Sequence, residues 1–128
     1  MTKTKVRIEY PLNQSSKDIL WNAISTTAGL ERWFADRVNK TGKLFSFQWG
    51  KTEKREANLV SSRSDSFIRF HWTDDSEPKT YFEMRIVHNE LTSELTLEIV
   101  DFAEEDEEDD VYDLWDMQIK NLRRAYGL

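Results

Sequence analysis

Few side chains in this sequence have the type and spacing that catalysis requires. Its two histidines, His71 and His88, have no nucleophile or acid partner at a diagnostic spacing. His71 is out of phase with Phe70 and Trp72, so its side chain is expected to face away from theirs on a strand. His88 falls at a strand end beside the turn at Asn89. Neither histidine is therefore identified as catalytic, and this favours a binding protein over an enzyme.

Asp101 carries the acidic side chain that is best placed for chemistry inside the fold. It is in phase with Leu95, Leu97 and Ile99, and this alternation is compatible with a carboxylate that points inward. A solvent-facing position at the end of a strand is the alternative, and we favour it. Any enzymatic hypothesis depends on which of these two positions Asp101 takes.

Other kinds of site find little support. The sequence has no cysteine, which excludes disulfides, thiol catalysis and cysteine-ligated zinc. The acidic run 104–110 lacks the glycine and the ligand order of an EF-hand loop, so we predict no metal site. No glycine-rich phosphate loop and no G-x-S-x-G motif occurs. We therefore expect no metal and no cofactor.

The main candidate site is apolar. The chain has 5 Trp, 4 Tyr and 7 Phe, and most of them fall inside strand-like runs. Ligand pockets are lined mainly by apolar and aromatic side chains with a few polar anchors. We expect one set of side chains to point into a cavity between the sheet and the terminal helix: Phe45, Phe47, Trp49, Phe70, Trp72, Phe82, Met84, Leu97, Trp115 and Ile119. The same stripe is also typical of a filled core, which is the commoner case, and the sequence leaves both interpretations open.

These residues must be positioned by helices and strands, of which the longest is predicted near the carboxyl terminus. Residues 107–126 carry apolar side chains at helical spacing: Val111, Trp115, Ile119, Leu122 and Tyr126, with Leu114 beside them. Acidic residues crowd the start of this segment and basic residues its end, which suits the helix dipole. Gly127 follows the last periodic residue and is expected to end the helix.

A meander of about seven antiparallel strands is predicted from short alternating runs separated by turns. The strands are expected near residues 5–10, 37–40, 44–49, 57–61, 67–72, 82–86 and 95–99. Pro11 is expected to end the first strand because proline cannot donate to the ladder. In the fourth run, Ala57, Leu59 and Ser61 are expected to face inward.

Two short helices are predicted between the first and second strands. Ser15 or Ser16 can cap the first helix, whose apolar stripe is formed by Ile19, Leu20, Ala23 and Ile24. The cluster 25–27 ends that helix and can cap the second, which carries Leu30, Trp33 and Phe34 on one side. A curved sheet must cover its apolar face, and the terminal helix is the large element left to do so. The predicted class is therefore α+β, with the sheet wrapped around the carboxyl-terminal helix in a single domain, residues 1–128.

The charge distribution limits the classes of partner. A formal net charge of -6 argues against binding to nucleic acid or to anionic membranes. Basic residues gather in the early strands, at Lys40, Lys43, Lys51, Lys54 and Arg55, whereas acidic residues gather at 104–116. A solvated surface explains this pattern, and a docking patch for a protein is the alternative. With no apolar signal core and no run of membrane-spanning length, we expect a cytoplasmic protein.

The predicted order of one strand, two helices, six strands and a long helix resembles the START-like superfamily, which has the helix-grip fold. Residues 27–36, TAGLERWFAD, resemble the GLxRWF segment of the branch named after an activator of a heat-shock chaperone's ATPase. Residues 41–47, 70–72 and 94–99 resemble further strands of that branch, and Trp115, Ile119 and Leu122 resemble its closing helix. The resemblance covers nearly the whole chain.

Three functions are implied by this resemblance, because the superfamily includes carriers of lipids and other hydrophobic ligands, cyclases and aromatases, and a chaperone co-factor domain. The first hypothesis is a small domain that binds an apolar or aromatic small molecule. The second is a chaperone co-factor whose basic strands and acidic helix start contact a chaperone partner. The third is a cyclase-like enzyme that uses a polar group in the cavity, for which Asp101 is the candidate.

Overall fold

The computed structural model describes residues 3–12 and 16–128. Its elements follow in the order β1 (Thr4–Leu12), α1 (Lys17–Ser25), α2 (Thr27–Glu31), β2 (Arg37–Thr41), β3 (Leu44–Trp49), β4 (Glu53–Arg63), β5 (Phe67–Trp72), β6 (Phe82–Asn89), β7 (Glu94–Ala103) and α3 (Glu108–Tyr126). The predicted order of elements is confirmed, and so is the α+β class.

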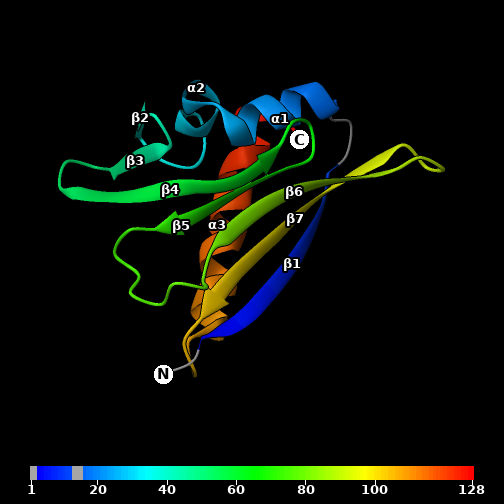
Figure 1. Cartoon of the computed structure of the whole chain (residues 1–128). Coiled ribbons are helices and arrows are strands. Elements are labelled where there is room, and N and C mark those ends of the chain that lie inside the picture. Colours follow the sequence, from blue (N-terminus) through cyan, green and yellow to red (C-terminus); the bar gives the residue numbers. More distant parts are fainter. Residues whose placement is uncertain (1–2, 13–15) are drawn as a thin grey trace.

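Within the described residues, seven strands form a single antiparallel sheet in the order β1-β7-β6-β5-β4-β3-β2. The first strand therefore lies beside the last, with a register that runs from Thr4 opposite Ala103 to Leu12 opposite Leu95. Figure 1 shows the curved sheet spread across α3, with α1 and α2 at one end of that helix. The helix-grip arrangement expected from the sequence is thus the observed one.

The core lies between one face of the sheet and the helices α1, α2 and α3. Phe45, Phe47, Phe70, Phe82 and Leu97 are all at most 1 % exposed. The rings pack edge to face or stacked, with centroids 4.9 Å apart for Phe45 and Phe70 and 5.1 Å apart for Phe70 and Phe82. These geometries are the preferred ones for aromatic pairs, so the strands are held in register by specific ring contacts as well as by burial.

The long helix α3 buries one side and exposes the other. Trp115, Ile119 and Leu122 are at most 3 % exposed, whereas Leu114 is 49 % exposed. Gly127 ends the helix with a φ of 68°, and its amide donates to the carbonyl of Arg123. No helix within residues 3–12 and 16–128 combines the length and apolar character that crossing a membrane requires.

On the opposite face of the sheet, a row of charged side chains crosses the strands. Glu83 is only 3 % exposed and accepts hydrogen bonds from Arg69 and Arg85 at 2.8–3.1 Å. Burial by itself raises the pKa of the Glu83 carboxyl, but the two guanidinium groups outweigh it, and the net shift is downward. The carboxylate is therefore buried as a paired ion.

Two details of the strands differ from the sequence-based expectations. The strand β1 continues through Pro11, which lies opposite Thr96, to Leu12. Proline is tolerated there because β1 is an edge strand. In β4, a bulge between Leu59 and Ser61 shifts the register, so Ser61 is exposed rather than inward.

The helices α1 and α2 also depart from their predicted form. Ser16 caps α1 by accepting a hydrogen bond from the amide of Ile19, whereas Ser15, the other predicted cap, lies outside the described residues. Ile19 is 51 % exposed and does not belong to the buried stripe. The helix α2 ends at Glu31, so Trp33 and Phe34 lie in the turn that follows it.

Candidate functional site

A cleft of about 1130 Å³ opens to solvent beside α3. Its aromatic walls come from five parts of the chain, with Phe34 after α2, Trp49 on β3, Trp72 on β5, Phe82 on β6 and Trp115 on α3. The loop 73–81 between β5 and β6 contributes to the rim. The strands and α3 thus bring side chains that are far apart in the sequence to one concave surface.

The predicted cavity residues divide into two groups. Trp49, Trp72, Phe82 and Trp115 line the cleft. The other six are at most 2 % exposed and belong to the packed core rather than to the cleft lining: Phe45, Phe47, Phe70, Met84, Leu97 and Ile119. The ring centroids of Phe47 and Trp72 lie 5.7 Å apart, so the core rings support the lining rings. The structure therefore combines a filled core with an open cleft at its border.

The backbone carbonyl of Phe34 fixes two of the lining side chains. It accepts a hydrogen bond of 2.8 Å from the indole Nε1 of Trp49 and one of 3.1 Å from Nε2 of Gln118 on α3. The ring of Phe34 lies 6.0 Å from those of Phe82 and Trp115, measured between centroids. These contacts tie β3, β6 and α3 together, so the cleft walls are positioned before any ligand arrives.

Asp101 lies on the cleft lining and is half-buried, which corrects the favoured expectation of a solvent-facing position. One carboxylate oxygen accepts a 2.8 Å hydrogen bond from Nε1 of Trp115, and the other accepts a 2.7 Å bond from the amide of Phe102. Burial raises the pKa of Asp101, and these bonds together with the charges of Arg55 and Lys3 offset only part of that rise.

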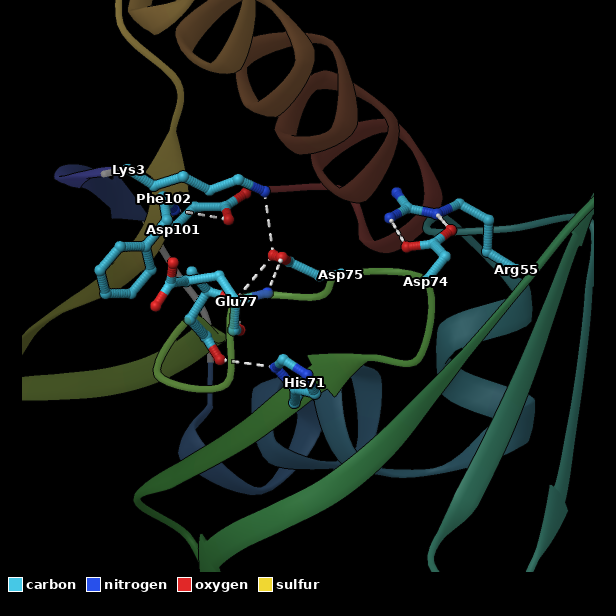
Figure 2. Close-up of polar contacts among 9 residues, drawn as sticks. Lys3, Arg55, His71, Asp74, Asp75, Glu77, Asp101 and Phe102 are labelled. Carbon is cyan, nitrogen blue, oxygen red and sulfur yellow. Dashed lines mark hydrogen bonds and ion pairs between the residues drawn. The ribbon is translucent and has the colours of Figure 1, made fainter. Parts of the chain in front are cut away.

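Two neighbouring aspartates hold the loop 73–81 at the rim of the cleft. Figure 2 shows Asp74 turned toward Arg55 and Asp75 turned toward Lys3. Arg55 binds Asp74 through two bonds of 2.7 and 2.9 Å, and Lys3 lies 3.0 Å from Asp75. The guanidinium of Arg55 also stacks over the ring of Trp72 at 3.8 Å. The loop is therefore tied to β4 on one side and to the start of the chain on the other.

Asp75 makes a dense set of contacts for a loop residue. It accepts hydrogen bonds from the hydroxyl of Thr80 at 2.6 Å and from the amide of Glu77 at 2.9 Å, besides the ion pair with Lys3. Burial alone raises the pKa of Asp75, but the bonds from Thr80, Lys3 and Glu77 bring it down to about 2. The ionised form of Asp75 therefore stabilises the folded state.

Asp75→Asn is expected to lower the free energy of unfolding at pH 7 by about 1–2 kcal/mol, because a charged acceptor is lost while the amide oxygen still fits the site. The folded pKa of Asp75 is depressed to about 2. The stabilisation is thus present above the unfolded value and lost as the pH falls through the folded one. Urea unfolding should show the gap to wild type closing between about pH 4 and pH 2. A gap independent of pH, or one equal to that of the turn variant Glu90→Gln, would contradict the assignment.

The histidines are not part of the cleft lining. His71 is half-buried, and its Nδ1 lies 2.8 Å from the carbonyl of Thr80, so it supports the loop at the rim. His88 is exposed near the end of β6. Among residues 3–12 and 16–128, no group of three or more His, Asp or Glu side chains is placed to hold a metal ion.

Several residues of the cleft were missed by sequence reasoning. The sequence pattern places Phe34 on a helix face and Arg55 in a basic patch, yet both line the cleft, and so does Asp74. Gln118 carried a usable signal, because a polar residue adjoining Ile119 on an apolar helix face requires a buried partner. Arg55 on β4 pairs with Asp74 in the loop after β5, 19 positions further along the chain, and no local sequence pattern indicates this pair.

A model of the START-like superfamily domain matches residues 1–128, so the chain belongs to this superfamily. The curated proteins include no match to it. Because the superfamily is defined by its fold, membership fixes the scaffold and leaves the ligand to be argued from the cleft.

Solved structures share this fold across a wide range of sequence identity. The solution structure of BfR322 from Bacteroides fragilis is 54% identical, with a TM-score of 0.71, over 100% of this chain and 94% of that one. The Aha1 dimer from Colwellia psychrerythraea is 14% identical, with a TM-score of 0.73, over 98% of this chain and 96% of that one. DynU16, from the dynemicin biosynthetic locus, is 15% identical, with a TM-score of 0.75, over 96% of this chain and 47% of that one. At these lower identities the likeness concerns the fold alone.

Proposed function

We propose that the protein binds an apolar or aromatic small molecule in the cleft beside α3. The single observation that carries this proposal is the cleft itself, with a volume of about 1130 Å³ and walls that include Trp49, Trp72 and Trp115. Its volume lies at or just above the range of about 300–1,000 Å³ common for small-molecule sites, and its aromatic lining suits them. Binding of hydrophobic ligands is also common among START-like domains, to which this chain belongs.

Exposed apolar side chains at the mouth of the cleft favour the same function. Leu114 and Met117 on α3 are 49 % and 53 % exposed, and both line the cleft. Exposed apolar side chains at the mouth of a concave site add to the surface that a ligand removes from water. They also offer positions where the site can be changed without disturbing the core.

The double variant Leu114→Gln with Met117→Gln is expected to weaken binding of a neutral fluorescent dye such as Nile red by at least about fivefold, because it removes apolar contact area at the mouth of the cleft. The stability should change little, since both side chains are exposed. Dye titration followed by fluorescence measures the affinity, and urea unfolding measures the stability.

The matched control is Tyr112→Gln, which replaces another exposed apolar residue of α3 that does not line the cleft. It should leave dye affinity unchanged. Equal losses for the control and the double variant would show that the dye binds elsewhere on the helix, and no binding by the wild type would count against the proposed function itself.

A chaperone co-factor remains the alternative, and one observation favours it. The residues 105–110 before and at the start of α3 are all exposed, as are Lys40, Lys43, Lys51 and Lys54 in the early strands. Both charged segments are therefore accessible to a protein partner, although Arg55 is turned toward Asp74. Stimulation of the ATPase of a purified heat-shock chaperone would favour this function. The cyclase-like alternative rests on Asp101, one of the carboxylates on the cleft lining.

A further inference from the structure

The cleft has an uneven charge. Among residues 3–12 and 16–128, its lining includes the basic groups of Lys3, Arg32, Arg55 and Arg124, and twice as many carboxylates, those of Glu31, Asp36, Glu53, Asp74, Asp75, Glu77, Asp101 and Glu104. Low-dielectric walls concentrate the field of such groups, so a cleft lined by one sign of charge attracts ligands of the other sign. An excess of carboxylates around aromatic walls therefore favours a cationic ligand over an anionic one.

Most of the basic side chains at the cleft are already engaged. Lys3 and Arg55 form ion pairs with Asp75 and Asp74. Arg32 donates to the carbonyl of Ala125 at 2.6 Å and lies over the ring of Tyr126 at 4.1 Å. An anionic ligand would have to break these contacts to gain any of these three cations.

A smaller share of the acidic side chains at the cleft is engaged in ion pairs. Of the eight lining carboxylates, Asp74 and Asp75 are the two that form ion pairs within residues 3–12 and 16–128. Asp101 is bound by two neutral donors, the indole of Trp115 and the amide of Phe102. An ionised carboxylate has about four acceptor sites, so Asp101 retains room for another donor. Its half-buried position strengthens attraction to a cation, because the effective dielectric constant is lower there than in water.

The aromatic wall of the cleft already holds a cation in the protein's own structure. The Arg55 guanidinium lies 3.8 Å from the centroid of the Trp72 ring. Tryptophan is the aromatic side chain that attracts cations most strongly, over distances up to about 6 Å. Three further indoles, those of Trp33, Trp49 and Trp115, line the same cleft. A positively charged ligand group near this wall would thus be attracted by the ring faces as well as by carboxylates.

We propose that the ligand of this cleft is an amphiphile with an apolar or aromatic body and a protonated amine, and that Asp101 binds the amine. This inference rests on the proposed function and specifies its ligand class. The aromatic walls accept the body, while the Asp101 carboxylate, which is bound by the neutral donors of Trp115 and Phe102, distinguishes an amine from a neutral or acidic molecule of the same shape.

Three probes with the same ring system test the preference: 1-naphthylmethylamine, 1-naphthalenemethanol and 1-naphthoate. Isothermal titration of the full chain is expected to give an affinity for the amine about tenfold higher than for the alcohol, and a lower affinity for the carboxylate than for either. The advantage of the amine should shrink as salt rises from about 0.01 to 1 M, because screening weakens partly exposed charges.

Asp101→Asn tests the role of the carboxylate, and its amide oxygen can still accept from Trp115. We expect this variant to lower the amine affinity to that of the alcohol while the alcohol affinity stays within about twofold. Asp109→Asn, an exposed substitution of the same kind at the start of α3, should leave all three affinities unchanged. The comparison separates a local effect of Asp101 from the loss of one negative charge.

Each of the other outcomes would contradict a different part of the proposal. Equal affinities for the three probes would overturn the amine preference and leave the proposed function intact. An amine preference that survives Asp101→Asn would overturn the assignment of Asp101. No binding of any probe would overturn both the proposed function and the ligand class. If the Asn variant does not fold, the salt dependence of the wild-type amine affinity still tests the preference for an amine. An amine affinity that is insensitive to salt would overturn that preference.

Discussion

Replacement of Trp115 by alanine is expected to lower the free energy of unfolding by about 3–5 kcal/mol, because it leaves a cavity between α3 and the sheet. Trp115 is 3 % exposed, and its ring lies 6.0 Å from that of Phe34 and 6.2 Å from that of Phe82, measured between centroids. A loss of this size is a large part of the roughly 5–15 kcal/mol that stabilises a typical domain. Urea unfolding followed by far-ultraviolet circular dichroism measures it.

Trp115→Phe is the matched variant, because it keeps an aromatic ring in the same place and removes the bond from Nε1 to Asp101. Its cost should be smaller, about 1–2 kcal/mol. If Trp115→Ala costs less than about 1 kcal/mol, α3 is not packed on the sheet through Trp115, and this wall of the cleft is wrongly placed.

Gly29→Ala is expected to be the second strongly destabilising substitution, at about 3 kcal/mol or more, even though alanine ordinarily favours a helix. A Cβ atom at Gly29 would overlap the backbone oxygen of Asn22 and lie 2.8 Å from both Cα of Ala23 and Oγ1 of Thr26. Two of these atoms belong to the backbone of α1, so α2 would have to move away from α1.

This movement of α2 would also disturb the cleft. The helix α2 leads directly to Phe34, whose carbonyl holds Trp49 and Gln118. Gly29→Ala should therefore weaken dye binding as well as lower the urea midpoint. Gly42→Ala is the matched control: a Cβ there meets no atom within 4 Å, so only the left-handed backbone with φ of +61° costs energy, about 1–2 kcal/mol. Equal losses at Gly29 and Gly42 would refute the close approach of α1 and α2.

The architecture was predictable because hydrophobic periodicity reports burial directly. Phe45 and Phe47 alternate with polar residues and are buried, and Trp115, Ile119 and Leu122 recur at helical spacing and are buried too. The errors arose where tertiary context overrides a local rule. Pro11 continues a strand because that strand is at the sheet edge, and Ser61 turns outward because a bulge interrupts the alternation.

The cleft was less predictable than the fold. Alternation places Phe70 and Trp72 on the same face of β5, yet Phe70 is fully buried in the core and Trp72 lines the cleft. The difference depends on where α3 crosses the sheet and on the loop that carries Asp74 and Asp75. No periodic pattern in the sequence indicates either of these. Asp101 was equally hard to place from the sequence. Its alternation with Leu95, Leu97 and Ile99 allowed an inward carboxylate, but the inward position depends on the hydrogen bond from Trp115 on α3.

The most direct test of a ligand site beside α3 is a ¹⁵N spectrum of the indole N–H groups during titration with 1-naphthalenemethanol. Trp33, Trp49, Trp72 and Trp115 line the cleft, whereas Trp21 on α1 does not, so the chain carries its own control. We predict saturable shifts of the Trp49, Trp72 and Trp115 signals while the Trp21 signal stays in place. Movement of the Trp21 signal alone, or of none of the signals, would contradict a binding site in this cleft.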